Sequence, residues 1–453
     1  MKKLMRRLST AMLCIVVAES FFASGRLAAR YMHALTEDDS YANPVVPSAH
    51  AEQVSIFSRI ERVLTYTSLD APDEGEALAH VVWDDAWFGQ DDTVYNHELA
   101  RTASVLAALA YSESGYYQSS GDHPPYMENA LSELGFSEVD TEAYRFRSQV
   151  VDEVLNLVTS DTDVVAYTVA RKRVYEHGAS ASSGAAAQVE AEGVLGEGDG
   201  ADVASARDII VVSVRGSYGS EWLSNLDLSR DEGGDHGGYV RAAHEIAEHL
   251  STWIASSRLD GANVSVLLVG HSRGGAVANL VAAELDDMRA SMPTSVDQVY
   301  AYTFASPATT LNPEARDARY DNIFNIANPA DIMPSLPLRS WGYERYGIDL
   351  ELPIDGSVGF DDLDARMRAM YEDTVGVACA ADGSDAHVVE AVVSDIASQI
   401  SSVEELVTPQ GALEVVRSLA LHVNPVRILY SHYPSTYISW MQVLDEADVQ
   451  RCV

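Results

Sequence analysis

Residues Val264–Gly275 read VSVLLVGHSRGG, an apolar run that ends in a Gly-x-Ser-x-Gly pattern. The run Val264–Val269 is typical of a parallel strand that is buried on both faces. Small and apolar residues follow at once and predict a helix over Gly275–Leu285. Glycine on both sides of Ser272 lets such a strand and helix approach closely, so we expect a sharp turn that exposes the Ser272 hydroxyl at the carboxyl edge of a sheet. The alternative is a glycine-rich turn in which Ser272 only caps the helix.

Strand and helix patterns alternate around this turn. Buried apolar runs predict further strands at 208–214, 298–304 and 322–326, and an amphipathic pattern predicts a helix over 242–257. This alternation indicates an α/β fold with a mostly parallel central sheet flanked by helices. Between 341 and 421 the strand signals disappear, so we expect a helical insertion there.

The charge of the chain excludes some partners. Its 453 residues include 68 Asp and Glu against 30 Lys and Arg, a formal net charge of −38 at pH 7. Phosphate backbones and anionic lipid headgroups repel such a chain, so nucleic acid is not an expected partner. No cluster of Cys and His indicates a metal site, and no feature indicates an obligate protein partner.

The first 25 residues have the pattern of an export signal. Two Lys and two Arg precede the apolar run Leu8–Val17, and Glu19 interrupts the run before it reaches the length of a membrane span. We expect a signal peptide over 1–25, or an uncleaved signal anchor, and therefore a secreted or cell-surface protein. In an oxidising compartment Cys379 and Cys452 either form one bridge or remain two free thiols.

Changes in composition and pattern along the chain indicate its domain boundaries. We expect an N-terminal extension, partly flexible, over 26–92, a main α/β domain over 93–440 and a C-terminal tail over 441–453. Apolar residues at helical spacing predict a helix over 95–111. Residues 178–206 are rich in Gly, Ala, Ser and Glu and contain no aromatic residue, which predicts a flexible surface insertion.

A serine nucleophile needs two partners. Its hydroxyl reacts poorly until a histidine accepts the proton, and a carboxylate must hold that histidine in the correct tautomer. With this kind of turn the chain order is serine, acid, histidine. Asp331 follows the predicted strand 322–326 and would share the sheet edge of Ser272, so it is the candidate acid; a turn or helix-capping role is the alternative. Asp321 precedes that strand and belongs to the opposite edge.

Two late histidines are candidates for the base. His432 opens a loop before the final helical pattern, from which its side chain can reach back to the catalytic edge. His422 ends an apolar helical run and is better suited to packing or capping there. We favour His432.

The oxyanion that forms on attack needs two hydrogen-bond donors. The backbone N–H of Arg273, directly after the nucleophile, is one candidate. Ser217 is the other, because it lies in the loop that follows the predicted strand 208–214. The alternative for that loop is a plain β-turn.

Ordered blocks of sequence between about 95 and 440 resemble the class 3 lipase family of α/β-hydrolases. The blocks are VVSVRGS, EWLSNLDL, HGGY, LLVGHSRGGAVANL, YTFASPA, NPADIMPSLP and SHYPSTYISW. The resemblance implies an α/β-hydrolase fold with Ser272 as nucleophile, Asp331 as acid, His432 as base, and Ser217 with Arg273 as the oxyanion hole. It also implies hydrolysis of acyl esters, often acylglycerols, with no metal or organic cofactor.

The sequence departs from that family in three places, one of them mild: Ile332-Met333 stands in the acid loop where Pro-Val is common. Ala305 stands where the family usually has glycine before Ser-Pro, and the insertion 341–421 is longer than in compact fungal members. Near the oxyanion loop, Trp222, Leu223 and Leu226 are candidates either for an apolar lid or for the core.

The expected function is that of an exported serine ester hydrolase whose substrate is a lipid or a small ester, met in solution or at a lipid interface. A triacylglycerol lipase, a phospholipase A1 and a short-chain carboxylesterase all fit this description. A peptidase on the same fold is one alternative, although we find no charged anchor for a peptide terminus. A catalytically inactive fold that serves as a surface binding module is the other, and its usual signature is a missing triad member.

Overall fold

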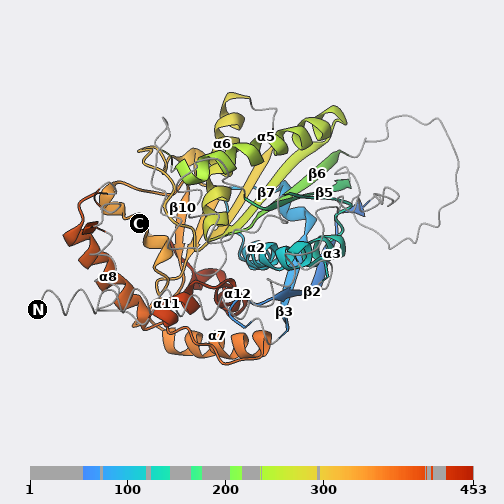
Figure 1. Cartoon of the computed structure of the whole chain (residues 1–453). Coiled ribbons are helices and arrows are strands. Elements are labelled where there is room, and N and C mark those ends of the chain that lie inside the picture. Colours follow the sequence, from blue (N-terminus) through green and yellow to red (C-terminus); the bar gives the residue numbers. More distant parts are fainter. Residues whose placement is uncertain are drawn as a thin grey trace, which may run out of the picture. The chain divides into compact units, whose positions relative to one another are not determined.

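A mostly parallel sheet runs through the chain (Figure 1). The computed structural model describes residues 55–451 apart from 72–74, 119–123, 143–164, 176–204, 217–234, 236, 293–295, 403–404, 406–409 and 412–424. The sheet has the order β1-β5-β6-β7-β8-β9-β10-β11, and β4 pairs with β5. Its strands are β1 Ser55–Ile56, β4 Glu138–Glu142, β5 Tyr167–Tyr175, β6 Ala206–Val214, β7 Asn263–His271, β8 Gln298–Phe304, β9 Ile323–Ala327, β10 Ile348–Glu351 and β11 Gln450–Arg451.

The five central strands, β6 to β10, run parallel to one another. Antiparallel pairs occur toward the outside, where β5 joins β6, β4 joins β5 and β11 joins β10. The four strands predicted from apolar runs are therefore confirmed, with ends that differ by two residues or fewer. The mostly parallel sheet of the predicted α/β-hydrolase fold is confirmed as well.

Helices cover both faces of this sheet (Figure 1). Alternate residues of one strand enter different cores: Val211 belongs to the core that contains residues of α2 and α12, whereas Val212 belongs to the core that contains residues of α5 and α6. The helices are α2 His97–Gln118, α3 Tyr126–Glu133, α5 Gly237–Leu259, α6 Arg273–Ser291, α7 Phe360–Val375, α8 Asp385–Gln399, α11 Pro425–His432 and α12 Pro434–Val443. The short 3-10 helices are η1 Asp85–Gly89, η3 Ala318–Tyr320, η4 Met333–Ser335, η5 Arg339–Trp341 and η6 Glu446–Asp448. None of the helices built from the described residues combines the length and the apolar character that crossing a bilayer requires.

A two-stranded sheet occupies part of the segment that we expected to be a partly flexible extension. Its strands, β2 Arg59–Thr67 and β3 Glu76–Asp84, pair antiparallel. In β3 the residues Ala77, Ala79, Val81 and Trp83 are buried, while the residues between them are exposed or half-buried. Most of the acidic residues of this hairpin lie on its outward face, and its inward residues, among them Leu64 and Tyr66 of β2, belong to the core.

A buried ion pair fixes this hairpin to the main sheet. Lys172 Nζ on β5 lies 2.8 Å from Asp85 Oδ1, and both side chains are almost completely buried. The indole N–H of Trp83 donates to the same oxygen, and the backbone N–H of Ser58 donates to Asp85 Oδ2. These donors satisfy the carboxylate that burial has removed from water.

The segment between the predicted acid and histidine is not wholly helical. Its first element is β10, which pairs parallel with β9, and α7 and α8 follow. The prediction of a helical insertion over 341–421 is therefore wrong for 348–351. Only four residues form β10, and one of them is Asp349, which is buried against Arg345, so no apolar run marks the strand.

Several predictions fall on residues outside the described part of the chain. These are the export segment 1–25, nearly all of the insertion 178–206, Ser217, the lid candidates Trp222, Leu223 and Leu226, His422 and Cys452. Cys379 is described and is a half-buried free thiol.

Candidate active site

Ser272 lies at the sharp turn between β7 and α6. Its backbone has φ 57° and ψ −129°, in the left-handed region that side chains disfavour. The backbone N–H of Ser272 donates to the carbonyl oxygen of Phe304 at 2.8 Å, which ties the turn to the end of β8. The sharp turn that the sequence pattern predicted is therefore present, and its backbone is strained in a way that is characteristic of functional turns.

The glycines of the turn permit this geometry. A Cβ atom on Gly270 would lie 2.3 Å from the carbonyl oxygen of Gly274, and one on Gly274 would lie 2.2 Å from that of Val214. Both separations are far shorter than any tolerated contact, so no other residue fits at either position without a shift of the backbone.

A line of hydrogen bonds joins Ser272, His432 and Asp331. His432 Nε2 lies 3.0 Å from Ser272 Oγ, and His432 Nδ1 lies 2.8 Å from Asp331 Oδ2. A carboxylate only accepts, so Nδ1 of His432 carries the hydrogen and Nε2 of the neutral ring is left to accept the serine proton. The structure thus brings together the three side chains that the sequence singled out, in an arrangement that can activate a hydroxyl.

His432 reaches the site from a helix rather than from a loop. It is the last residue of α11, and only Tyr433 separates α11 from α12. The expected loop is therefore a junction between two helices. All three members of the line are buried, with Ser272 4%, His432 8% and Asp331 1% exposed.

Asp331 has two further donors that sequence reasoning missed. The hydroxyl of Tyr437 donates to Asp331 Oδ2 at 2.9 Å, and the backbone N–H of Met333 donates to Oδ1 at 2.9 Å. Complete burial, together with the Asp331 carboxylate, raises the pKa of Tyr437 well above its ordinary value, so the phenol stays protonated and remains a donor. Tyr437 also accepts from the backbone N–H of Asn328 at 3.0 Å.

A buried arginine braces the loop that carries the acid. Nη1 of Arg345 donates to the carbonyl oxygens of Ser306 at 2.8 Å and Pro334 at 2.6 Å, which joins the end of β8 to the loop after Asp331. Asp349 pairs with Arg345 at 2.9 Å. Although burial opposes ionisation of Asp349, the guanidinium groups of Arg345 and Arg316 together outweigh it and hold the pKa of that carboxyl well below its usual range.

Of the two predicted oxyanion donors, the structure describes one. Arg273 is the first residue of α6, so its backbone N–H lies at the positive end of that helix. Ser217 lies outside the described residues, but Gly216 directly before it is described and buried.

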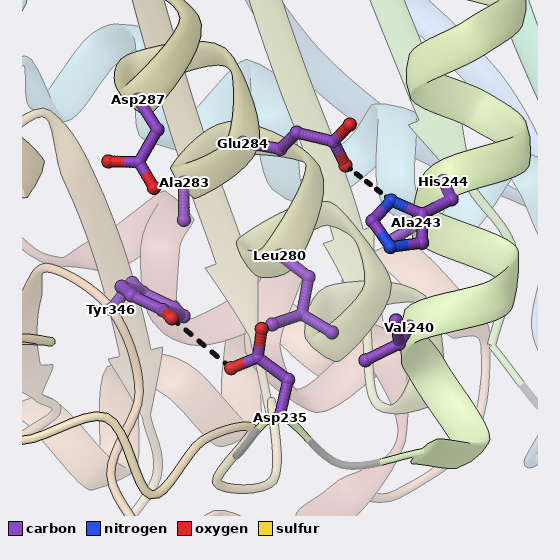
Figure 2. Close-up of a pocket in the computed structure, with 9 residues that line it drawn as sticks. All are labelled: Asp235, Val240, Ala243, His244, Leu280, Ala283, Glu284, Asp287 and Tyr346. Atoms are coloured by element: carbon purple, nitrogen blue, oxygen red, sulfur yellow. Dashed lines mark hydrogen bonds and ion pairs between the residues drawn. The ribbon is translucent and has the colours of Figure 1, made fainter. Parts of the chain in front are cut away.

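A hollow of about 180 Å³ lies between α5 and α6 (Figure 2). Figure 2 shows Glu284 facing His244, with 2.9 Å between the carboxylate and Nδ1, and the Tyr346 hydroxyl facing Asp235 at 3.1 Å. The remaining lining residues are Val240, Ala243, Leu280, Ala283 and Asp287. None of the predicted catalytic or oxyanion residues belongs to this hollow.

Comparison with known proteins gives matches to part of the chain. Residues 211–341 match the family described as Lipase (class 3). The chain is 26% identical over 199 residues to a secreted mono- and diacylglycerol lipase 2 of Gibberella zeae, and 29% identical over 159 residues to a secreted mono- and diacylglycerol lipase 1 of Fusarium solani. These matches cover 34% and 33% of this chain and 46% of each relative, so the chain spans less than half the length of the curated relatives it matches.

Solved structures of lipases also match. One is a triacylglycerol lipase described as having a serine protease triad at its catalytic centre, 17% identical, with a TM-score of 0.36 over 57% of this chain and 82% of that one. Another is a mono- and diacylglycerol lipase from Aspergillus oryzae, 22% identical, with a TM-score of 0.27 over 35% of this chain and 61% of that one.

Proposed function

Because residues 211–341 match the class 3 lipase family, we propose that this chain is an exported serine hydrolase that cleaves carboxylic esters of acylglycerols. The observation that carries the proposal is the hydrogen-bonded line Ser272–His432–Asp331 at a strained strand–helix turn. The names of the two fungal relatives support acylglycerols as the substrate class and support export, as does the charged and apolar pattern of residues 1–25.

In the acylation step, Ser272 Oγ attacks the ester carbonyl carbon while its proton moves to His432 Nε2. Asp331 stabilises the imidazolium, and Tyr437 and Met333 keep the carboxylate in place. The electron pair of the carbonyl bond forms an oxyanion, which accepts hydrogen bonds from the N–H of Arg273 and from Ser217. The tetrahedral intermediate then collapses, and His432 returns the proton to the departing alkoxide oxygen, which leaves as an alcohol.

Deacylation repeats these steps with water. His432 Nε2 accepts a proton from a water molecule as its oxygen attacks the acyl carbonyl, and then protonates Ser272 Oγ as the fatty acid leaves. The chain's own groups carry out every proton transfer.

The alternative of an inactive binding module has less support, because none of the three catalytic positions has lost its residue type. Within the enzyme class, triacylglycerol lipase, phospholipase A1 and short-chain esterase differ in the acyl chain and headgroup that they accept. We place acylglycerols first because both curated relatives carry mono- and diacylglycerol in their names.

The test is hydrolysis of p-nitrophenyl esters from C2 to C16 and of emulsified diacylglycerol by wild type and Ser272→Ala. We expect Ser272→Ala to lose ~10⁴–10⁶-fold in kcat, as serine hydrolases do when the nucleophile is removed. Ser439→Ala is the matched control, since Ser439 is also buried but donates only within α12 to the Ser435 carbonyl. A folded wild type that hydrolyses none of these esters would overturn the proposal, and so would a Ser272→Ala variant that keeps wild-type activity.

A further inference from the structure

Two buried side chains that the proposed mechanism does not use lie beside the catalytic histidine. His271 is the last residue of β7, and its Nε2 lies 2.7 Å from the main-chain oxygen of His432. Tyr111 on α2 places its hydroxyl 3.1 Å from Nδ1 of His271. Both side chains are 2% exposed.

The chemistry of these groups fixes the position of each hydrogen. A carbonyl oxygen only accepts, so Nε2 of His271 carries a hydrogen and donates it to His432. Burial, and then the neighbouring His432 ring, lower the pKa of His271 well below its ordinary value, so the ring is neutral and Nδ1 holds a lone pair. Tyr111 therefore donates its hydroxyl hydrogen to Nδ1, and the two bonds form a directed chain from Tyr111 through His271 to His432.

Tyr111 also lies against the turn that leads to the predicted oxyanion residue Ser217. A Cβ atom on Gly216 would lie 2.0 Å from the Tyr111 hydroxyl and 2.5 Å from the carbonyl oxygen of His271. Only glycine fits there, which brings the Tyr111–His271 pair close to the main chain directly before Ser217.

We propose that Tyr111 and His271 are positioning residues. They hold the main chain of His432 and of Gly216 at fixed positions relative to Ser272. The inference rests on the proposed function. His271 is covalently adjacent to Ser272, so its bond to the His432 carbonyl spans the nucleophile and the base directly. A misplacement of about 1 Å between such groups costs on the order of 100-fold in rate.

The test compares three substitutions. Tyr111→Phe removes the hydroxyl alone; His271→Asn places an amide near Nδ1 and loses the donor to His432; His271→Gln places an amide near Nε2 and keeps that donor. We expect Tyr111→Phe and His271→Asn to lower kcat ~10–100-fold, the range set by small misplacements of reacting groups, with KM within about twofold of wild type. His271→Gln should recover most of kcat, which a merely structural loss of the imidazole would not produce.

A second tyrosine–histidine pair supplies the matched control. Tyr167 places its hydroxyl 3.0 Å from Nδ1 of His249, and the ring centroids are 5.8 Å apart in both pairs. Neither Tyr167 nor His249 belongs to the proposed machinery, so Tyr167→Phe should leave kcat unchanged. A Tyr111→Phe variant that is folded by circular dichroism and keeps wild-type kcat would overturn the inference, as would an equal loss in Tyr167→Phe.

A readout that does not depend on activity separates this inference from the proposed function. In ¹⁵N-histidine spectra, with His271 assigned by its loss in His271→Gln, we expect the neutral Nε2–H tautomer at neutral pH. An Nδ1–H tautomer, or a protonated ring at neutral pH, would contradict the hydrogen-bond chain even in an active enzyme. If wild type shows the expected tautomer but hydrolyses no ester, the hydrogen-bond chain is present and the proposed function is wrong. The positioning role, which rests on that function, is then wrong as well.

Discussion

Replacing Asp331 by asparagine tests how the carboxylate controls the proton on His432. Oδ1 of Asp331 accepts from the backbone N–H of Met333, so the oxygen of an asparagine amide must take that position. The amide NH₂ then takes the place of Oδ2, where it faces His432 Nδ1 at about the present 2.8 Å. Two N–H groups cannot face each other, so His432 must carry its hydrogen on Nε2, where it can no longer accept the proton of Ser272.

The magnitude follows from this tautomer change. The corresponding aspartate-to-asparagine change in serine proteases leaves the geometry intact and lowers kcat ~10⁴-fold, and we expect a loss of that order here. The assay is kcat for a short p-nitrophenyl ester, with thermal unfolding measured in parallel.

Asp286→Asn is the matched control for a buried aspartate. Burial raises the pKa of Asp286 although Arg289, 2.9 Å away, opposes the shift, and Oδ1 of Asp286 accepts from Arg289 and Asn322, a position that an amide oxygen can also take. We expect its kcat to stay within about twofold of wild type. An Asp331→Asn variant that is folded and retains more than a tenth of wild-type kcat would show that Asp331 does not set the tautomer of His432.

Three further predictions concern packing and charge. Gly274→Ala should give an inactive or unfolded protein by activity and circular dichroism, because its Cβ would lie 2.2 Å from the Val214 carbonyl oxygen; wild-type activity would contradict this. Lys172→Met leaves Asp85 charged and buried without its partner, so urea unfolding should show a loss of ~3–5 kcal/mol, and a change below ~1 kcal/mol would show that the pair contributes little. Burial raises the pKa of Glu113 from its ordinary value to about 8, so this residue favours the folded state fully below about pH 4 and progressively less as pH rises through 8. Glu113→Gln should therefore be more stable than wild type at pH 9 in urea titrations, and equal stability of the two proteins at pH 9 would refute the shift.

The sequence was most informative where local pattern and burial coincide. The apolar runs that predicted β6 to β9 are buried on both faces, and the glycines around Ser272 have direct steric reasons. The sequence also contains a pattern for β3, because apolar inward residues alternate with outward residues over Glu76–Asp84. The acidic residues at its two ends obscured this strand pattern. The strand β10 gave no such signal, because four residues are too few to show a period and Asp349 interrupts them.

Contacts between distant segments lay beyond sequence reasoning. Chain order and sheet edge were enough to nominate Asp331 and His432, because parallel strands end at a common edge. The bond from Tyr437 to Asp331 and the bond from Tyr111 to His271 each join residues more than 100 positions apart, and neither has a local pattern. Such contacts depend on how α2 and α12 pack on the sheet, which composition and periodicity do not specify.

The proposed function depends above all on Ser272 being the nucleophile that His432 and Asp331 activate. The most direct measurement is mass spectrometry of the peptide containing Ser272 after brief exposure to a fluorophosphonate probe, in wild type, Ser272→Ala and Asp331→Asn. We expect one adduct on Ser272 in wild type, none in Ser272→Ala, and labelling slowed by orders of magnitude in Asp331→Asn. An adduct on another residue, or labelling of Ser272→Ala at the wild-type rate, would show that Ser272 is not the nucleophile.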